Sequence, residues 1–419
     1  MSAETLDRDR VRKLFDLRSA YVAHSGGGYQ DDPYPTWHRL RESGPVHPGT
    51  VHELTGFPGD LVFQGLPFPE RPHFSVFSYE TCNAAYRNPE IFASSPDGVD
   101  IASGGTVVTN SMLSMGGAQH RRYRALVQPS FLPSNATWWI ENWIRETVHL
   151  LIDGISGAGR AELNVDFCAP IPVLTITGSF GVPVEQALNI RANLTSNPRA
   201  VVEILKPIVA ARRQDPQDDL ISMLVQAEIT DEEGVTQQLS DREIFSFSLL
   251  LLAAGSGTTW KQMGTTLTIL LQRPELLAAA REDRQLLRSV IEESLRWMPT
   301  DPMFSRWVAA DTEFYGVHLP KGAVVHLCIG AANRDPDRWE RPDEFDPLRQ
   351  LKSSFAFGGG VHVCLGMHVA RAEMMVGIGA VLDRLSNLRL DPDAEQPRFV
   401  GMYERGATEI PVLFDTPGV

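Results

Sequence analysis

The sequence predicts a mainly α-helical fold with a minor β part. Apolar residues recur at helical spacing through most of the chain, as in WWIENWIRETVHLLIDGI from Trp138 to Ile155. The stretch from Arg273 to Pro299 has the same spacing and indicates two successive helices. Pro274 suits the first turn of one helix, and Pro299 ends the other.

Strand-like residues are fewer and gather between Arg306 and Gly330. Turn residues divide this region at Tyr315-Gly316 and again at Pro320-Lys321-Gly322. From Ala331 to Phe357 the chain is rich in Pro, Asp and Arg and has no clear period, which is typical of a long functional loop. Because no linker or repeat interrupts the chain, we expect a single domain over residues 1–419.

Composition excludes several classes of partner. The chain has 419 residues and a formal net charge of -14, which disfavours nucleic acid and anionic membrane surfaces. Its first residues are charged, so we expect no signal peptide or anchor. No apolar run reaches the roughly 20 residues of a membrane-spanning helix.

The chain has four widely separated cysteines and no CxxC pair, which fits a reducing cytoplasm. They are Cys82, Cys168, Cys328 and Cys364.

The strongest local signal is FAFGGGVHVCLGMH, from Phe355 to His368. Its three glycines allow the backbone to approach another group closely. Cys364 directly precedes a helical pattern, and a helix N-terminus lowers the pKa of a thiol. A single thiolate with no second cysteine nearby is a natural axial ligand for haem iron. The alternative is a buried structural cysteine beside a turn.

The motif F-x-x-G-x-x-x-C-x-G, formed by Phe357, Gly360, Cys364 and Gly366, resembles the haem-ligand signature of the cytochrome P-450 family. The resemblance implies the cytochrome P-450 fold, in which a long central helix crosses the haem and a small region is β-rich. It also implies that the iron of haem b binds Cys364. Other residues at the family's haem-contacting positions are Phe357, Gly358, Gly366 and Ala254.

Glu293 and Arg296 match the family's E-x-x-R motif. Alone, this spacing is also that of an ordinary solvated salt bridge. The resemblance implies a buried ion pair that braces the cysteine loop, joined by a second arginine. Arg341 and Arg349 are both candidates for that arginine.

The two haem carboxylates require basic partners, and arginine can bind a carboxylate through two hydrogen bonds. The residues that resemble the family's propionate-binding positions are His120, Arg124, Arg306 and His362. Each, taken alone, also fits an ordinary surface charge.

The stretch LLLLAAGSGTTW, from Leu249 to Trp260, breaks an apolar run with glycine, serine and threonine. A phosphate-binding loop needs a glycine before its lysine, but Lys261 follows Trp260. In the family this segment lies in the central helix over the haem. The glycines and a Thr hydroxyl that bonds back to a carbonyl loosen the helix there, which implies a groove for O2.

One departure concerns catalysis. Gly257 stands where the family usually has an acid before the threonine, here Thr258. That acid helps to deliver protons to bound oxygen, so Ser256, Thr258 and Thr259 become candidates for a water-filled relay. Three outcomes stay open: ordinary hydroxylation through water, poor coupling with loss of peroxide, or peroxygenase-like or non-hydroxylating chemistry. A non-catalytic haem sensor is the alternative from another class.

The family's pocket positions are mostly apolar in this chain and imply a lipophilic small-molecule substrate. They are Phe247, Leu250 (or Leu251), Ala254, Thr258, Pro302, Met303, Phe304, Met402 and Tyr403. Plain core packing is the alternative for these residues. The lid region from Gly181 to Arg213 is shorter than usual, whereas the stretch from Thr55 to Phe74 is longer.

No flavin or iron–sulfur segment follows the haem region, so we expect no fused reductase and a separate ferredoxin-type electron donor. A basic patch on the cysteine side would attract an acidic ferredoxin. Its members are Arg121, Arg122, His368 and Arg371. A solvated surface of mixed charge is the alternative.

Overall fold

The computed structural model describes residues 7–15, 31–57, 70–95, 111–194, 196–230 and 234–416. Most of the described chain is helical. The helices are α1 (Arg8–Phe15), α3 (Tyr34–Ser43), α4 (Val51–Thr55), α5 (Tyr79–Arg87), α6 (Gly117–Val127), α7 (Ala136–Trp139), α8 (Arg145–Ser156), α9 (Pro170–Ser179), α10 (Val184–Asn193), α11 (Pro198–Gln214), α12 (Leu220–Gln226), α13 (Asp241–Gly257), α14 (Thr259–Leu271), α15 (Pro274–Glu282), α16 (Arg284–Trp297), α17 (Ile329–Ala332) and α18 (Met367–Arg384).

The strands form one larger sheet and several small ones. They are β1 (His47–Pro48), β2 (His73–Val76), β3 (Phe92–Ala93), β4 (Arg160–Glu162), β5 (Glu228–Thr230), β6 (Thr236–Gln238), β7 (Phe304–Val308), β8 (Thr312–Phe314), β9 (Val317–Leu319), β10 (Val324–Leu327), β11 (Ser386–Leu390), β12 (Phe399–Val400), β13 (Gly406–Ala407) and β14 (Pro411–Asp415). The five-stranded sheet has the order β1-β2-β10-β7-β3, and its pairs are antiparallel except for the parallel pair β2–β10. A three-stranded sheet has the order β11-β14-β4.

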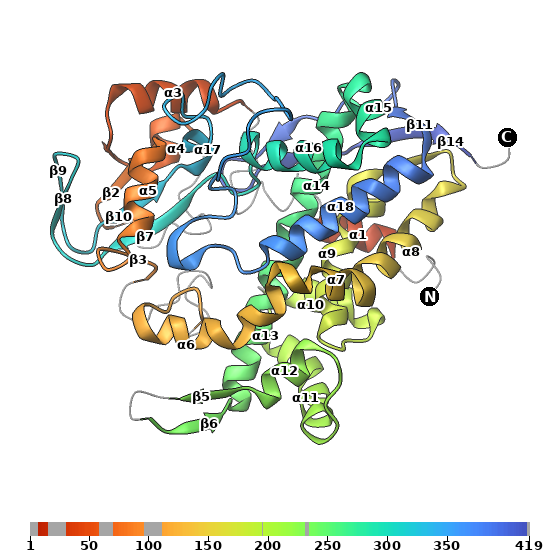
Figure 1. The fold of residues 1–419 in the computed structure, drawn as a ribbon, viewed down its shortest axis with the longest axis horizontal. Helices are drawn as coiled ribbons and strands as arrows, with labels where there is room; N and C mark the ends of the chain where they lie inside the picture. The colour runs from red at the N-terminus through yellow and green to blue at the C-terminus, as the bar shows by residue number, and fades with distance from the viewer. Residues whose placement is uncertain are drawn as a thin grey trace.

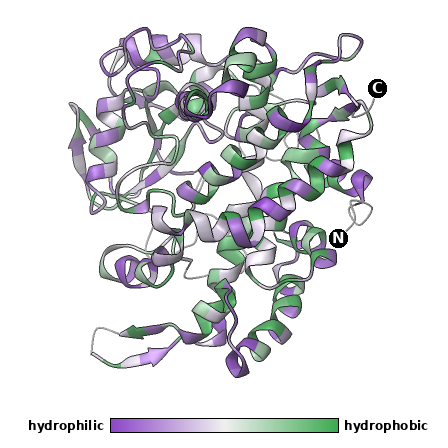
Figure 2. Cartoon of the chain, turned by 45° about the vertical axis from the view of Figure 1, so that its right-hand side comes forward, coloured by the Kyte–Doolittle hydropathy of each residue, from purple (hydrophilic) through white to green (hydrophobic). Residues whose placement is uncertain are grey.

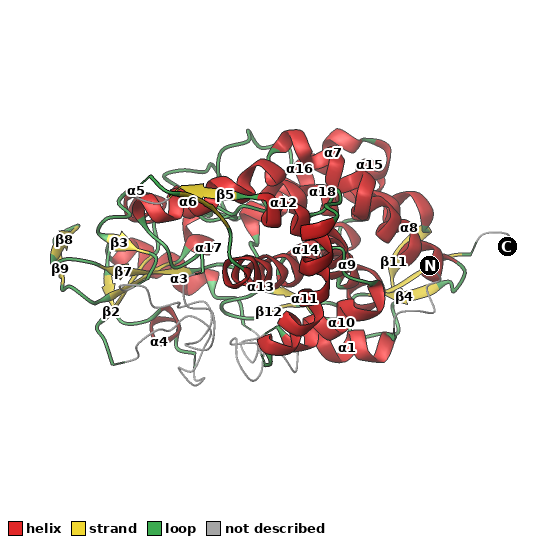
Figure 3. Ribbon diagram, turned by 90° about the horizontal axis from the view of Figure 1, so that it is seen from below, coloured by secondary structure: helices red, strands yellow, loops and turns green. Residues whose placement is uncertain are grey.

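The five-stranded sheet and the helical body occupy opposite ends of the molecule (Figure 1). Helices α3, α4 and α5 accompany the sheet, whereas α8, α9 and α18 lie in the helical body. Helices α13 and α14 run between the two parts, and a view along α13 confirms this central place (Figure 3). The fold therefore combines a large helical part with a small β part, as the sequence predicts.

The central helix passes through the hydrophobic core. Ser240 and Glu243 form a capping box that fixes the start of α13. Every residue of α14 is buried, including Lys261. The outer helices show hydrophobic and hydrophilic stripes, because one face of each packs on this core and the other faces water (Figure 2).

Most of the elements predicted from periodicity are confirmed. Residues 136–156 are helical throughout, with a π-helical turn at Ile140–Ile144 between α7 and α8. Helices α15 and α16 are the two predicted between Arg273 and Pro299, and strands β7 to β10 occupy the predicted β region. Beyond α17 the chain runs to residue 359 without a regular helix or strand.

Both predictions about segment length stay predictions. In the lid region, α10 has 10 residues and α11 has 17, and residues 194–197 separate them. The predicted insertion from Thr55 to Phe74 falls mainly on residues 58–69, which lie outside the described residues.

Among the described residues, no single helix is long and apolar enough to cross a membrane, although the bent pair Asn164–Ser179 with Val184–Asn193 meets the criterion of length and composition.

Candidate active site

The segment that carries Cys364 is a tight loop held against α5. The backbone N–H of Cys364 donates to the oxygen of Phe357 over 2.9 Å. Gly360 has a φ of +67°, and a Cβ added there would overlap the backbone oxygen of Tyr86. Only glycine combines this conformation with so close an approach. The backbone of the glycine run therefore approaches another group closely, as predicted, and that group is α5.

The Cys364 side chain faces accessible space within the fold. It is exposed, whereas the thiols of Cys82, Cys168 and Cys328 are buried. Surrounding protein nevertheless desolvates the Cys364 thiol and raises its pKa above the ordinary value, although the backbone of Gly366 opposes this change. The prediction that the helix terminus lowers this pKa is thus wrong for the metal-free thiol, because desolvation is the larger effect. A bound iron cation would stabilise the thiolate.

The four side chains predicted to bind haem carboxylates lie together. The rings of His120 and His362 have their centroids 4.0 Å apart. Burial, and then the charges of His120, Arg306 and Arg124, lower the pKa of His362 to about 3. Nε2 of His120 is buried and has no hydrogen-bond partner among the described residues. Because desolvated basic groups need an anion, this cluster fits the two propionates of haem.

The central helix breaks where the sequence predicts it. Helix α13 ends at Gly257 and α14 begins at Thr259, with φ −95° and ψ −41° at Thr258. Ala254 is exposed and Thr258 half-buried, although α14 is wholly buried. The Thr258 hydroxyl makes no hydrogen bond within the described chain, so the predicted bond back to a carbonyl is not seen. That hydroxyl is available to a ligand or a water molecule.

The residues before Thr258 have different surroundings. A Cβ added to Gly255 would lie 3.0 Å from Cγ1 of Ile176 in α9, so this glycine permits close helix packing. The hydroxyl of Ser256 lies 3.5 Å from Nη1 of Arg191 in α10. A Cβ added to Gly257 would lie 4.0 Å from that same nitrogen. The position that lacks the usual acid therefore adjoins a basic group.

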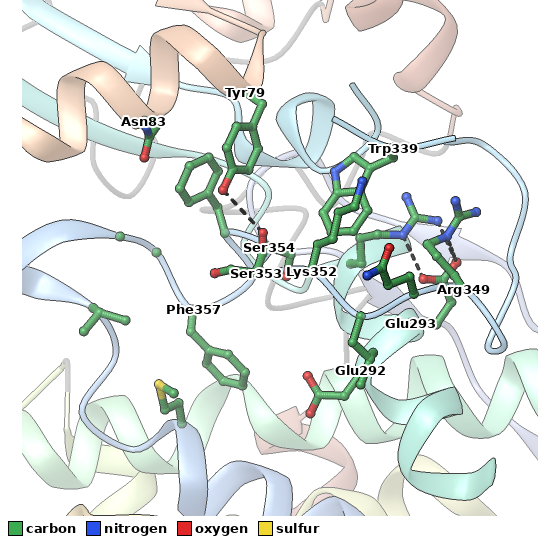
Figure 4. A pocket seen from close by; sticks show the side chains of 18 of the residues that line it. Tyr79, Asn83, Glu292, Glu293, Trp339, Arg349, Lys352, Ser353, Ser354 and Phe357 are labelled. Carbon is green, nitrogen blue, oxygen red and sulfur yellow. Dashed lines mark hydrogen bonds and ion pairs between the residues drawn. The ribbon is translucent and has the colours of Figure 1, made fainter. Parts of the chain in front are cut away.

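The predicted Glu293–Arg296 ion pair is buried. Arg296 donates to both carboxylate oxygens of Glu293, over 2.7 and 2.8 Å. Arg349 joins it, with Nε 3.3 Å from Oε1 of Glu293 (Figure 4). Arg341 instead pairs with Glu344. The structure thus decides between the two candidate arginines in favour of Arg349.

Comparison with known proteins agrees with this geometry. The family described as Cytochrome P450 matches residues 188–403. A biotin biosynthesis cytochrome P450 of Bacillus subtilis (strain 168) is 30% identical over 407 residues, which cover 92% of this chain and 96% of the relative.

The chain belongs to the cytochrome P450 family.

Other relatives and solved structures support this assignment. A steroid C26-monooxygenase of Mycolicibacterium smegmatis is 32% identical, covering 80% of this chain and 86% of the relative. The crystal structure of P450BioI in complex with hexadec-9Z-enoic acid ligated acyl carrier protein has a TM-score of 0.74 at 28% identity and covers 92% of this chain and 99% of that one. CYP109E1 from Bacillus megaterium in complex with testosterone has a TM-score of 0.76 at 25% identity, with coverages of 92% and 100%.

As a cytochrome P450, the chain is an oxidoreductase that binds haem b and acts as a haem-thiolate monooxygenase. The residues that carry this activity stay predictions. The structure shows one further buried acid near the helix break, Glu373, that the sequence did not point to. Glu373 in α18 is buried, and its pKa rises to about 8 because of burial, although the hydroxyls of Thr175 and Thr259 oppose the change. A buried acid therefore lies behind the helix break. Its signal in the sequence is an acid within the apolar run AEMMVGIGAVL.

The predicted substrate-lining residues of this cytochrome P450 divide between several places. Phe247 stacks on Tyr123 with ring centroids 5.7 Å apart and lines a pocket of about 360 Å³ beside α6. Met303, Met402 and Tyr403 pack together in one cluster around Trp37. The remaining residues lie elsewhere: Leu250 packs at the edge of the main core, Phe304 packs at the edge of the sheet's core, and Pro302 accepts a hydrogen bond from the backbone of Gly330.

The face beneath the cysteine loop carries a cavity of about 660 Å³. Helices α5 and α16 and residues 346–360 line it, with Phe357 and Glu292 at its wall (Figure 4). Arg371, predicted for the basic patch, pairs with Glu292 over 2.5 Å and lies 4.6 Å from the centroid of the Phe357 ring. That pairing neutralises one charge of the predicted patch, which stays a prediction.

Proposed function

We propose that this cytochrome P450 hydroxylates a lipophilic small molecule with O2 and two electrons from a separate ferredoxin-type protein. Cys364 binds the haem iron, and bound haem supplies the oxygen-activating chemistry. The observation that carries this proposal is the convergence of an accessible, desolvated Cys364 thiol with a cluster of basic groups at His120 and His362.

The described residues support a division of roles around the haem. His120, Arg124, Arg306 and His362 bind and orient its carboxylates. The Cys364 loop is fixed by the Phe357 hydrogen bond and by the contact of Gly360 with α5. Such fixed placement of the ligand holds the reactive centre at one distance from the central helix.

In this proposal, residues at the helix break deliver protons to the reaction. Thr258 holds a water molecule through its unbonded hydroxyl. Glu373 lies behind Thr259, and a pKa of about 8 lets it gain and lose a proton near neutral pH. This arrangement replaces the acid that Gly257 lacks, and ordinary hydroxylation is therefore the reaction that we favour.

The substrate is proposed to be lipophilic because Phe247, which lines the pocket beside α6, and Ala254, which is exposed at the helix break, are apolar. Relatives named as an erythromycin C-12 hydroxylase and a steroid C26-monooxygenase are consistent with this class. All four cysteines are free thiols, which supports a cytoplasmic location.

The ferredoxin is proposed to dock on the cysteine side, where Arg121 is exposed beside the half-buried Arg122. Stopped-flow reduction of the haem by ferredoxin under carbon monoxide tests this without a known substrate. We expect the double variant R121Q/R122Q to slow reduction at low salt by about tenfold and to weaken its salt dependence. The matched control is R384Q/R389Q, which removes two charges in α18 and β11. Equal rates for the two double variants would contradict the docking site.

A peroxide-driven reaction is the second candidate, because no acid stands at Gly257 and Arg191 adjoins this position. Turnover with hydrogen peroxide alone that exceeds turnover with ferredoxin would favour it over the monooxygenase reaction.

A further inference from the structure

Three segments converge beside the central helix, just beyond the Thr258 break. The backbone N–H of Thr300 donates to Oε1 of Gln262 in α14 over 3.1 Å. The backbone N–H of Arg405 donates to the oxygen of Thr300 over 2.6 Å. These bonds bring residues 300–302 and 401–405 together against α14. An ion pair between Lys261 and Glu404 crosses the same junction.

Asp301 follows Thr300 at this junction, one turn of the central helix beyond Thr258, because Gln262 donates its own backbone N–H to the oxygen of Thr258 over 3.2 Å. Its side chain is partly accessible, although the flanking Thr300 and Pro302 are buried. Its charge acts on the Cys364 thiol and raises the pKa of that thiol. Asp301 also directly precedes the strand residues predicted to line the substrate pocket. Asp301 therefore lies close to the helix break, with its side chain partly accessible.

Among the described residues, the Asp301 carboxylate makes no hydrogen bond and no ion pair. Lys261 acts on it electrostatically, but Lys261 is itself paired with Glu404. Burial, followed by the charge of Glu404, raises the pKa of Asp301 to about 7, and Lys261 opposes this rise. A desolvated acid without a partner is costly unless it is protonated or meets a cation.

We infer that Asp301 is a specificity-determining residue that binds a positively charged nitrogen on an otherwise lipophilic substrate. The inference rests on the proposed function, because it names the substrate class of the same site. A cationic group placed at Asp301 would complete an array of two acids and two positive charges together with Glu404 and Lys261. The apolar remainder of such a substrate would lie toward the half-buried Phe304.

The test uses a matched pair of probes on the haem-loaded protein. The cation is 4-phenylbutyl-trimethylammonium, whose quaternary nitrogen cannot ligate iron. The neutral probe is its carbon isostere, (5,5-dimethylhexyl)benzene. Equilibrium dialysis and the shift of the Soret band both report binding. We expect the cation to bind at least about tenfold more tightly than the isostere.

Asp301→Asn should reduce this preference by about tenfold and leave the dissociation constant of the neutral probe within about twofold. Asp393→Asn removes an exposed carboxylate elsewhere and should change neither value. An unchanged preference in Asp301→Asn, or a wild-type protein that does not prefer the cation, would overturn the inference. A thiolate-type spectrum of the reduced, CO-bound wild type keeps that failure distinct from a failure of the proposed function.

Discussion

His120 and His362 lie with their ring centroids 4.0 Å apart and their planes tilted by 39°. One residue comes from α6 and the other from the turn just before Cys364, so the pair links the cysteine loop to a helix more than 200 positions away in the sequence. With Arg124 and Arg306 nearby, this pair forms the basic end of the proposed haem site.

Loss of His120 should weaken haem retention, because its buried Nε2 is available to a haem carboxylate. Transfer of haem to apomyoglobin measures the dissociation rate. We expect His120→Ala to raise that rate about tenfold, as for the loss of one charge-assisted hydrogen bond. His149→Ala changes an exposed histidine of α8 and serves as the control. Equal rates in the two variants would exclude His120 from the site.

Gly360→Ala should distort the cysteine loop, because its φ is +67° and a Cβ would meet the backbone of Tyr86. We expect a loss of stability of about 2–4 kcal/mol together with a weakened thiolate-type spectrum. Gly379→Ala in α18 is the control, since nothing lies within 4 Å of a Cβ there either. Urea unfolding and the reduced, CO-bound spectrum measure both effects. A Gly360→Ala protein with unchanged stability and spectrum would show that the loop tolerates a side chain at this position, which would contradict the prediction.

Arg349 and Arg341 should differ sharply in their effect on stability. Arg349 contacts the buried carboxylate of Glu293, whereas Arg341 is 58% exposed and pairs with an exposed glutamate. We expect Arg349→Ala to lower the free energy of unfolding by about 2–3 kcal/mol and Arg341→Ala by less than about 1 kcal/mol. Urea unfolding compares the two. Similar values would contradict the assignment of Arg349 as the bracing arginine.

Glu373→Gln should separate structural and proton-relay roles. Burial raises the pKa of Glu373 to about 8, so the folded state holds a proton that the unfolded chain releases near pH 4.5. Folding stability from this group therefore falls by about 3 kcal/mol as the pH rises from about 5 to about 8. The glutamine variant should lose that pH dependence.

If Glu373 also helps to deliver protons, Glu373→Gln should release more peroxide per electron pair. Measurement of oxygen consumption, product and peroxide reports this coupling. A changed pH dependence of stability with unchanged coupling would leave Glu373 a structural residue only.

Gly257→Asp should place a carboxylate beside Arg191 and next to Thr258. If water relays protons to bound oxygen at this point, the new acid should raise the product-to-peroxide ratio by about twofold or more, since positioned acids accelerate proton transfer strongly. Gly257→Asn controls for size and helix propensity. Equal ratios in the two variants would count against a relay at this position, and haem binding should be intact in both.

Local sequence patterns predicted the helical body, the Cys364 loop and the Glu293–Arg296 pair, because each depends on residues close together in the chain. Local patterns alone did not predict contacts across long distances, and the grouping of His120 with His362 was expected only from the family resemblance. The sequence left Arg341 and Arg349 as equal candidates, and only the folded loop shows which one reaches Glu293.

The burial of individual side chains could not be predicted from the sequence either. Helix-terminus reasoning gave the wrong direction for the pKa of Cys364, because it ignored the desolvation that the surrounding protein imposes. For the same reason, the sequence did not point to Asp301 and Glu373. Both are notable because they are desolvated acids, and neither belongs to a motif.

The most direct test of the haem-thiolate assignment is the absorption spectrum of the reduced, CO-bound protein beside Cys364→Ala and Cys168→Ala. Ligation of the iron by Cys364 predicts a red-shifted Soret band of thiolate-ligated haem in the wild type and in Cys168→Ala, whose thiol is buried. It also predicts loss of that band in Cys364→Ala. A band unchanged in Cys364→Ala, or a band of the histidine-ligated type in the wild type, would contradict it.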